Sequence, residues 1–389
     1  MAVVGPRQCG KTTLVKALGK EWEIFDLEKN SDFEQIRRDP DLFFRLHPEK
    51  VVIDEAQLLP EMFNALRVAI DDSRDVPGRY IITGSSSPRL TSAISESLAG
   101  RVGMIEMAPF SLPEVEAKPL SALAGLIADG ADIRDFPGQL KPVHSLSRIH
   151  ELWLKGGYPE PWCKGSERFH ELWMQNYFDT YLLRDLSRHF PGIHQARYRA
   201  FLGMLAGLSG TVINYSEMAR ALEVSHATVR TNMEIAHNTF IWHLLPAFSK
   251  DSAKRIVKHP KGYLRDSGLL HYLAHIRQMR QLMQHPYLGR SWEGFVIEEV
   301  LRQFNCAGKR VEASYYRTGA GAEVDLVLEG GFGVLPVEIK FGQAVKLRQI
   351  RGLMDFMNAF NCNRGLVICN DTRASMVTEK IASIPVQSL

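Results

Sequence analysis

The chain has 389 residues, 45% of them hydrophobic, and a formal net charge of +3. This length allows two or three domains with separate cores, and so small a charge does not by itself indicate a polyanionic partner. Five scattered cysteines without a C-x-x-C pair argue against structural zinc and for a reducing compartment. The sequence shows neither a signal peptide nor an apolar run of about 18 residues. We therefore expect a cytoplasmic protein without a membrane partner.

The first predicted strand runs directly into a P-loop, which is a phosphate-binding loop. Its pattern is Gly5-x-x-x-x-Gly10-Lys11-Thr12. The glycines allow a tight turn, and the inward N–H groups form an anion cradle with the N-terminus of the following helix. Lys11 is expected to reach the β- and γ-phosphates of ATP, and the Thr12 hydroxyl to coordinate Mg²⁺. The predicted nucleotide-binding residues are Gly5, Pro6, Arg7, Gln8, Cys9, Gly10, Lys11, Thr12 and Thr13.

Strands and helices alternate over residues 1–115. The P-loop helix is predicted over Lys11–Lys20, with Leu14, Val15 and Leu18 on its inward face. A strand over Trp22–Leu27 and a helix over Phe33–Phe44 follow. Such alternation predicts an α/β fold, with a mostly parallel sheet covered by helices on both faces. The nucleotide site should lie at the carboxyl ends of its strands.

Two carboxylates follow the next apolar strand, in Lys50-Val-Val-Ile-Asp54-Glu55. A strand beside the P-loop strand would place Asp54 near the metal ion. Glu55 would then orient or deprotonate the attacking water. The alternative is a buried strand with two solvated acids at its end.

A third strand, Arg79–Thr83, stops at a run of serines. Ser85 or Ser86 is expected where a sensor of the γ-phosphate would lie, although a serine run after a strand is also typical of a plain loop.

These motifs resemble those of a known group of ATPases. The residues concerned are Gly5–Thr13, Ile53–Gln57, Ile82–Ser86, Leu98–Arg101 and Met107–Ser111. Together they are similar to prokaryotic ATPases of the AAA+ superfamily that carry a C-terminal, restriction-endonuclease-like domain of unknown function. The resemblance implies ATP and Mg²⁺ as cofactors. It also implies that Arg101 contacts the γ-phosphate, either in cis or across a subunit interface of a homo-oligomer. The alternative for Arg101 is an ordinary solvated side chain.

Prolines and glycines cluster between about residues 112 and 150, and we interpret 116–197 as a helical connector or lid. A Gly156-Gly157 turn then precedes a helix predicted over Arg168–Arg188. Its aromatic residues at positions 173, 177 and 181 share one face and are expected to pack in a core.

Residues 198–265 have the pattern of a winged helix. Tyr215–Arg230 predicts a helix-turn-helix, with Ser216 and Ser225 as helix caps, and Phe240–Leu245 and Lys250–Lys261 predict the strands of the wing. Such units bind DNA or serve as structural and protein-contact modules. If the unit binds DNA, the candidate contacts on the second helix are Ser225, His226, Thr228 and Arg230.

The last predicted domain, 266–389, carries a second constellation. Glu293 lies on a predicted helix, Asp325 on a strand, and Glu338 and Lys340 on one face of the next strand. The carboxylates are candidate Mg²⁺ ligands, and the lysine would assist a water that attacks a phosphodiester. This pattern agrees with the restriction-endonuclease-like domain that the resemblance implies. The alternative is a hairpin with a solvated charged face.

The sequence thus predicts a Mg²⁺-dependent ATPase whose nucleotide state controls a C-terminal half that contacts DNA or protein. Its predicted catalytic residues are Glu55, Ser85 and Arg101, and its predicted metal ligands are Thr12 and Asp54. Two alternatives stay open. One is an ATP-regulated nuclease that uses Glu293, Asp325, Glu338 and Lys340. The other is a nucleotide-switched binding module with negligible turnover.

Overall fold

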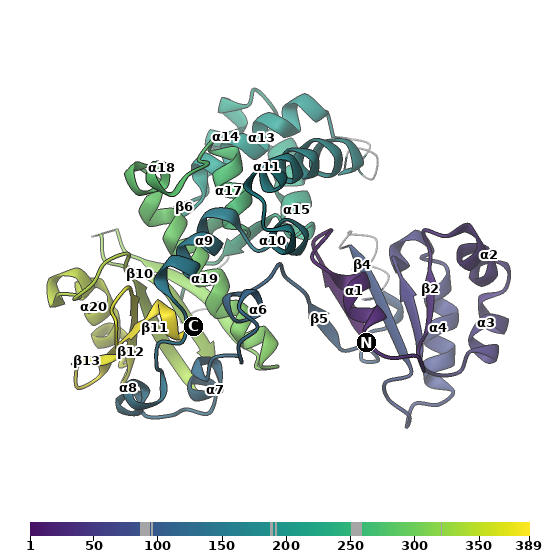
Figure 1. Ribbon diagram of the computed structural model, residues 1–389, viewed down its shortest axis with the longest axis horizontal. Coiled ribbons are helices and arrows are strands. Elements are labelled where there is room, and N and C mark those ends of the chain that lie inside the picture. Colours follow the sequence, from purple (N-terminus) through teal and green to yellow (C-terminus); the bar gives the residue numbers. More distant parts are fainter. Residues whose placement is uncertain (86–93, 95, 187–189, 191–192, 250–258, 320) are drawn as a thin grey trace. The chain divides into compact units, whose positions relative to one another are not determined.

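The computed structural model describes residues 1–85, 94, 96–186, 190, 193–249, 259–319 and 321–389 (Figure 1). The chain divides into two units. The first consists of residues 1–109, 158–160 and 235–241, and the second of residues 110–157, 161–234 and 242–389. Within the described ranges, no helix is both long and apolar enough to cross a membrane.

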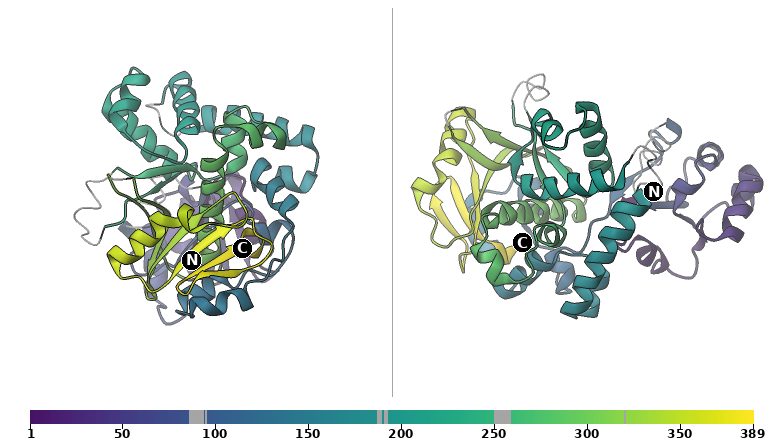
Figure 2. Two further views of the ribbon diagram at one scale, coloured as in Figure 1. Left: turned by 90° about the vertical axis from the view of Figure 1, so that its left-hand side faces the viewer. Right: turned by 90° about the horizontal axis from the view of Figure 1, so that it is seen from above.

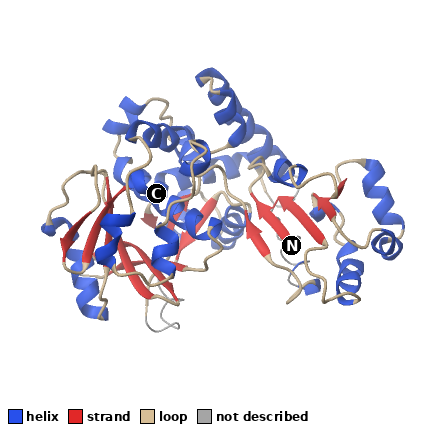
Figure 3. Cartoon of the chain, turned by 60° about the horizontal axis from the view of Figure 1, so that its bottom comes forward, coloured by secondary structure: helices blue, strands red, loops and turns tan. Residues whose placement is uncertain are grey.

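The first unit is built on a five-stranded parallel sheet with the order β2-β3-β4-β1-β5. Figure 3 draws the strands of this sheet as red arrows near the N-terminus. Its strands are β1 Ala2–Gly5, β2 Glu23–Asp26, β3 Val51–Asp54, β4 Tyr80–Ser85 and β5 Met104–Glu106. Its helices include α1 Lys11–Lys16, α2 Asn30–Arg38, α3 Pro40–Leu46, η1 Ala56–Leu58 and α4 Met62–Asp71.

Helices cover both faces of this sheet. Successive strand residues point to opposite sides, and here the residues on both sides are apolar and buried. On one face Val3, Val52 and Ile81 pack with Val15 of α1. The other face is covered by α2, α3 and α4. The predicted α/β fold with a parallel sheet is therefore confirmed. Leu14 was wrongly expected to face inward, since it is exposed on the short helix α1.

Two further details differ from the sequence predictions. The helix predicted over Phe33–Phe44 is broken, because Pro40 cannot continue the hydrogen bonds of α2. Asp39 instead begins α3 by accepting a hydrogen bond from the backbone N–H of Leu42 at 2.9 Å. Moreover, β3 does not lie beside the P-loop strand β1, since β4 lies between them.

The second unit begins with helices and a three-stranded antiparallel sheet of order β6-β8-β7. The elements from residue 112 to the end of this sheet are α6 Leu112–Val115, α7 Leu123–Ala128, η2 Ile133–Asp135, α8 Phe136–Gln139, α9 Leu146–Lys155, α10 Pro159–Lys164, α11 Glu167–Asn176, η3 Tyr177–Asp185, α13 Gln195–Leu208, β6 Thr211–Val212, α14 Tyr215–Ala221, α15 His226–Asn238, β7 Trp242–Leu245 and β8 Lys261–Leu264.

A six-stranded sheet with the order β13-β14-β12-β11-β10-β9 forms the rest of the second unit. The remaining elements are α17 Ser267–Leu273, α18 Met279–Gln284, α19 Leu288–Cys306, β9 Glu312–Arg317, β10 Glu323–Gly330, β11 Gly333–Ile339, η4 Leu347–Ile350, α20 Arg351–Phe360, β12 Gly365–Cys369, β13 Ser375–Thr378, β14 Ile381–Pro385 and η5 Val386–Ser388. Helix α20 packs on β10 and β11 through Leu353 and Phe356. Figure 2 shows this yellow-green part of the chain beside the strands of the C-terminal sheet. Residues of α19 pack in a second cluster, with Leu326 and Val337.

The segment expected to be a connector or lid belongs largely to this second unit. Leu123, Ile127 and Phe136 are buried in the cluster that also contains residues of α19 and of the six-stranded sheet. The backbone N–H of Val143 donates to the carbonyl of Gln387 at 2.9 Å. The segment therefore packs as part of the C-terminal core, because its apolar residues complete that core.

Further along the chain, Trp173, Tyr177 and Tyr181 are buried as predicted, with the rings of Trp173 and Tyr177 stacked at 5.0 Å. They lie on α11 and on the π-helical segment η3. The end of the predicted helix, at Arg188, lies outside the described residues.

In the predicted helix-turn-helix, one of the two helix caps differs from the sequence prediction. Asn214, rather than Ser216, caps α14, and its side-chain oxygen accepts from the N–H groups of Ser216 and Glu217. Ser225 does cap α15, since its hydroxyl accepts from the N–H of Thr228 at 3.0 Å. The predicted strand Lys250–Lys261 lies outside the described residues over 250–258, and β8 begins at its last residue.

Candidate functional site

The P-loop joins the carboxyl end of β1 to the N-terminus of α1. Gln8 and Gly10 adopt positive φ angles of 63° and 104°, which bring the backbone round in a tight turn. The side chain of Lys11 is folded into this turn and is only 4% exposed. Its ammonium donates to the carbonyls of Gly5 at 3.1 Å and Pro6 at 2.8 Å. The loop therefore holds a buried positive charge where the phosphates of a nucleotide are expected.

Asp54 connects the P-loop to the centre of the sheet. Its carboxylate is buried and accepts a hydrogen bond from the Thr12 hydroxyl at 2.7 Å. The hydroxyl of Thr83, on β4, donates to the other carboxylate oxygen. Asp54 reaches the P-loop although β3 is not adjacent to β1, because the carboxyl ends of parallel strands meet at one edge. A hydroxyl and a carboxylate are hard oxygen ligands, so this pair fits a Mg²⁺ site.

The carboxylate of Glu55 lies in a small polar network. Glu55 adopts the left-handed conformation, with φ of 57°, directly after β3. Ser85 donates to its carboxylate at 3.4 Å, and the side-chain amide of Gln57 contacts the same oxygen. This amide also donates to the Ser85 hydroxyl at 3.1 Å. The structure thus brings Glu55 and Ser85 together, whereas Ser86, the other predicted sensor, lies outside the described residues.

Thr83 and Gln57 were missed by the sequence reasoning. Thr83 is the polar residue in an otherwise apolar strand, Tyr80-Ile-Ile-Thr83, and this contrast could have identified it as a candidate site residue. Gln57 belongs to a motif that carried the resemblance, but its contact with Ser85 depends on how β3 and β4 pair.

The remaining predicted P-loop residues surround this core. The Cys9 thiol is buried, and burial raises its pKa. Arg7 lies 3.5 Å from the carboxylate of Glu28, while Gln8 and Thr13 are exposed. A Cβ atom at Gly5 would lie 2.2 Å from the carbonyl oxygen of Met107, so this position requires glycine.

The structure does not bring Arg101 to the P-loop. Arg101 precedes β5, and the N–H of Ala2 at the start of β1 donates to Gly103 at 2.8 Å. The P-loop follows the opposite end of β1. The Arg101 guanidinium instead contacts both carboxylate oxygens of Asp71, at 2.7 and 2.9 Å, and lowers the pKa of that carboxyl. The predicted contact in cis is absent from this arrangement, and the contact across a subunit interface stays a prediction.

The four residues of the second predicted constellation converge in the second unit. Asp325 on β10 and Glu338 on β11 are buried on neighbouring strands. Asp325 accepts from the N–H of Ile339 at 2.8 Å, and Lys340 lies 2.5 Å from Glu338. Glu293 approaches from α19 and, with Asp325, is among the charges that raise the pKa of Glu338.

Two residues of β8 enter the same constellation and were not predicted. The ammonium of Lys261 donates to Glu293 at 2.5 Å and to Glu323 at 2.8 Å. The hydroxyl of Tyr263 donates to Glu293 at 2.6 Å. Lys261 and Tyr263 are two residues apart on one strand, so their side chains point to the same face. Lys261 and Tyr263 could not be linked to Glu293 from the sequence, because they lie about 30 residues before it in the chain.

Burial and mutual repulsion raise the pKa values of the acids in this cluster. Burial and the charge of Asp325 raise the pKa of Glu293 to about 7 and that of Glu338 to about 8. Burial likewise raises the pKa of Asp325. Among the described residues, no group of three or more His, Cys, Asp and Glu side chains is arranged to hold a metal ion. As it stands, the cluster does not fit the predicted Mg²⁺, because lysine ammonium groups already contact its carboxylates.

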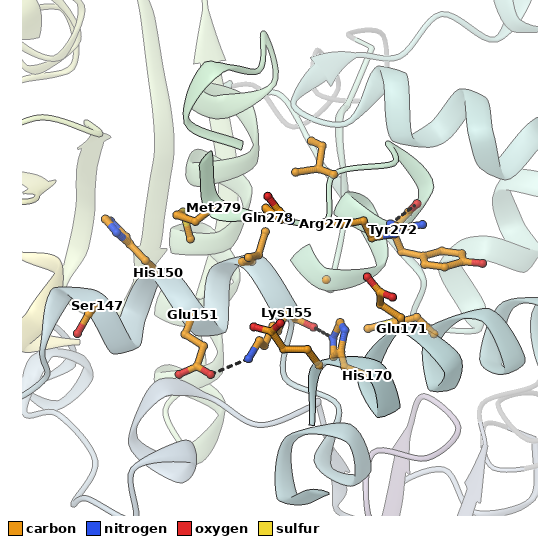
Figure 4. Close-up of a pocket in the computed structure, with 15 residues that line it drawn as sticks. Ser147, His150, Glu151, Lys155, His170, Glu171, Tyr272, Arg277, Gln278 and Met279 are labelled. Carbon is orange, nitrogen blue, oxygen red and sulfur yellow. Dashed lines mark hydrogen bonds and ion pairs between the residues drawn. The ribbon is translucent and has the colours of Figure 1, made fainter. Parts of the chain in front are cut away.

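A cavity of about 650 Å³ lies among α9, α11, α17 and α18 of the second unit (Figure 4). Leu154, Met174 and Ile276 contribute apolar lining. Figure 4 shows Glu151 turned towards Lys155, at 2.8 Å, and the ring of His170 against the carbonyl of Lys155, at 2.7 Å. The sequence does not indicate this cavity, because its lining comes from four helices that only the tertiary fold brings together.

Family models match three parts of the chain. Residues 1–116 match a model described as an AAA domain. Residues 146–280 match a domain of unknown function (DUF8612), and residues 288–389 match another (DUF4143). The first match covers the P-loop, Asp54, Glu55 and Arg101.

Two curated relatives are similar to most of the chain. The uncharacterized proteins Rv2008c of Mycobacterium tuberculosis and Mb2031c of Mycobacterium bovis are each 34% identical to it over 330 residues. The similarity covers 84% of this chain and 67% of each relative.

Solved structures are similar at a much lower level. A point variant of Thermotoga maritima RuvB has 14% identity and a TM-score of 0.29, over 66% of this chain and 86% of that one. The Aeropyrum pernix ORC1 protein in complex with DNA has 13% identity and a TM-score of 0.29, over 72% and 87%.

Proposed function

This chain belongs to the family of the mycobacterial proteins Rv2008c and Mb2031c, and from its AAA domain of the P-loop ATPase type we propose that it binds ATP and hydrolyses it with Mg²⁺. Lys11 would bind the phosphates, and Thr12 and Asp54 would hold the metal ion. The bound Mg²⁺ would neutralise phosphate charge during phosphoryl transfer. Glu55 would orient the attacking water and accept its proton, and Ser85 would sense the γ-phosphate.

The hydrogen bond between Thr12 and Asp54 is the observation that carries this proposal. This bond of 2.7 Å joins the P-loop to Asp54 at the end of β3. The phosphate-binding loop and the expected metal ligands therefore lie at one site. Glu55 is the next residue after Asp54, and it lies within the same edge of the sheet. A buried strand with two solvated acids would not explain the buried Asp54 carboxylate with hydroxyl donors on both oxygens.

Metal removal tests this proposal directly. We expect the wild-type chain to release phosphate from ATP with Mg²⁺ and to show only background release with excess EDTA. The measurement is a phosphate-release assay, accompanied by equilibrium binding of a fluorescent ATP analogue. Tight nucleotide binding without release in Mg²⁺ would contradict hydrolysis, and it would favour the nucleotide-switched binding module instead.

We further propose that the nucleotide state controls a C-terminal half that contacts DNA or protein. The order α13, β6, α14, α15, β7, β8 and the sheet order β6-β8-β7 support a winged helix. His226 and Arg230 are exposed on α15, which makes them the candidate DNA contacts. The hydroxyls of Ser225 and Thr228 contact each other at 2.9 Å in the helix cap. The order α19, β9, β10, β11, α20, β12 supports the restriction-endonuclease-like domain in the same way.

A single gel experiment separates DNA binding from DNA cleavage. We expect the wild type, with ATP and Mg²⁺, to retard duplex DNA and leave it intact, because the ammonium groups of Lys261 and Lys340 already contact the carboxylates that a metal ion for cleavage would need. Arg230→Ala should weaken the retardation by loss of a phosphate contact, and this loss should shrink at higher salt. DNA that is cut by the wild type but spared by Asp325→Ala, with ATP binding retained, would instead establish the nuclease alternative.

A further inference from the structure

The carboxylate cluster of the second unit encloses an ammonium group that comes from a different sheet. Lys261 lies on β8, which pairs with both β6 and β7 and is the central strand of the three-stranded sheet. Its side chain is 4% exposed and contacts Glu293 on α19 and Glu323 on β10. Because β8 is hydrogen-bonded to a strand on each side, its backbone fixes where the side chain of Lys261 begins.

The charges of the cluster explain why a cation is needed there. The cluster holds four carboxylates and two ammonium groups. The ammonium groups are those of Lys261 and Lys340, and the carboxylates are those of Glu293, Glu323, Asp325 and Glu338. A third positive group, the guanidinium of Arg317, lies 3.9 Å from Glu323. Buried carboxylates without compensating charge are strongly unfavourable. A compact ammonium with three donors bridges two carboxylates in the way that a metal ion does.

One carboxylate oxygen in the cluster remains without such a partner. Oε2 of Glu338 is buried and has no hydrogen-bond partner among the described residues, although Oε1 lies 2.5 Å from Lys340. Glu338 itself is 6% exposed. The cluster therefore has acceptor capacity beyond what its two lysines satisfy.

We propose that Lys261 is the built-in cation of this cluster and takes the place of a divalent metal ion, so that metal ions are kept out of the cluster. The proposal is independent of the ATPase function, because it concerns only residues of the second unit. It also explains why the predicted metal ligands converge without forming a metal site: the ammonium already bridges Glu293 and Glu323.

Removing Lys261 should therefore create a divalent cation site. We expect Lys261→Met to bind Mn²⁺ at least about tenfold more tightly than the wild type. The measurement is the free Mn²⁺ signal in electron paramagnetic resonance, with nucleotide-free protein, at a pH above the pKa of about 8 of Glu338. Mn²⁺ should also raise the Tm of Lys261→Met but leave that of the wild type unchanged.

Three variants make this test specific. Lys309→Met removes an exposed lysine that pairs with Asp129 at 3.0 Å, and it should behave as the wild type. Lys261→Arg keeps the positive charge and should gain no site. Adding Asp325→Asn to Lys261→Met should remove the gained site. Equal Mn²⁺ affinity of the wild type and Lys261→Met would overturn the proposal.

The proposal stays testable if Lys261→Met does not fold. In the otherwise wild-type chain, Asp325→Asn should leave Mn²⁺ binding unchanged, because the cluster holds no metal ion there. Loss of a bound Mn²⁺ on Asp325→Asn would show that the cluster binds metal in the presence of Lys261, and the proposal would be wrong. ATP turnover enters neither measurement, so failure of the ATPase function would leave both results interpretable.

Discussion

Lys11→Ala should abolish ATP binding and lower phosphate release by at least about 10²-fold. The ammonium of Lys11 is 4% exposed and is held inside the P-loop by the carbonyls of Gly5 and Pro6. A bound nucleotide would place its phosphates in this loop, where the charge acts in surroundings with little water and is therefore strong. The measurements are equilibrium binding of a fluorescent ATP analogue and phosphate release.

Lys16→Ala is the matched control for this variant. Lys16 lies on the same helix, α1, but is exposed. Its replacement removes one positive charge and should leave both nucleotide binding and turnover unchanged. Turnover by Lys11→Ala at the wild-type rate would exclude the assigned role of the P-loop. A thermal unfolding curve for each variant shows whether a lost activity reflects a lost fold.

Glu55→Gln should bind ATP and hold it unhydrolysed, with turnover lowered between about 10²- and 10⁴-fold. The amide keeps the size of the side chain but cannot accept a proton from water. Ser85 can still donate to the amide oxygen, so the local network loses little. The measurement combines phosphate release with the nucleotide content of the protein after it is separated from free ATP.

Glu61→Gln is a suitable control for Glu55→Gln, because Glu61 is an exposed acid that precedes α4. We expect this variant to turn over ATP at the wild-type rate. If Glu55→Gln lost nucleotide binding together with turnover, Glu55 would belong to the binding site rather than to the hydrolytic step. Undiminished turnover would instead mean that another group activates the water.

Much of the nucleotide site could be predicted from local patterns. The glycine spacing, Lys11 and Thr12 lie within one short stretch, and Asp54 with Glu55 directly follows an apolar strand. A parallel sheet gathers such strand ends at one edge whatever the strand order is. For that reason Thr12 and Asp54 meet although β3 was wrongly expected beside β1.

The helix boundaries were predicted less well, because they depend on single side chains. Asp39 and Pro40 divide one predicted helix into two, and Asn214 caps α14 in place of Ser216. Leu14 shows the limit of an apolar pattern, since it is exposed although it was expected on the inward face of α1.

The sequence by itself determined the P-loop, its acidic strand end and the alternation of the N-terminal sheet, because each depends on residues close together in the chain. Only the tertiary structure decided the position of Arg101 near the amino end of β1 and the entry of Lys261 between the carboxylates of Glu293 and Glu323. These contacts depend on strand order and on the packing of distant segments, which no local periodicity encodes.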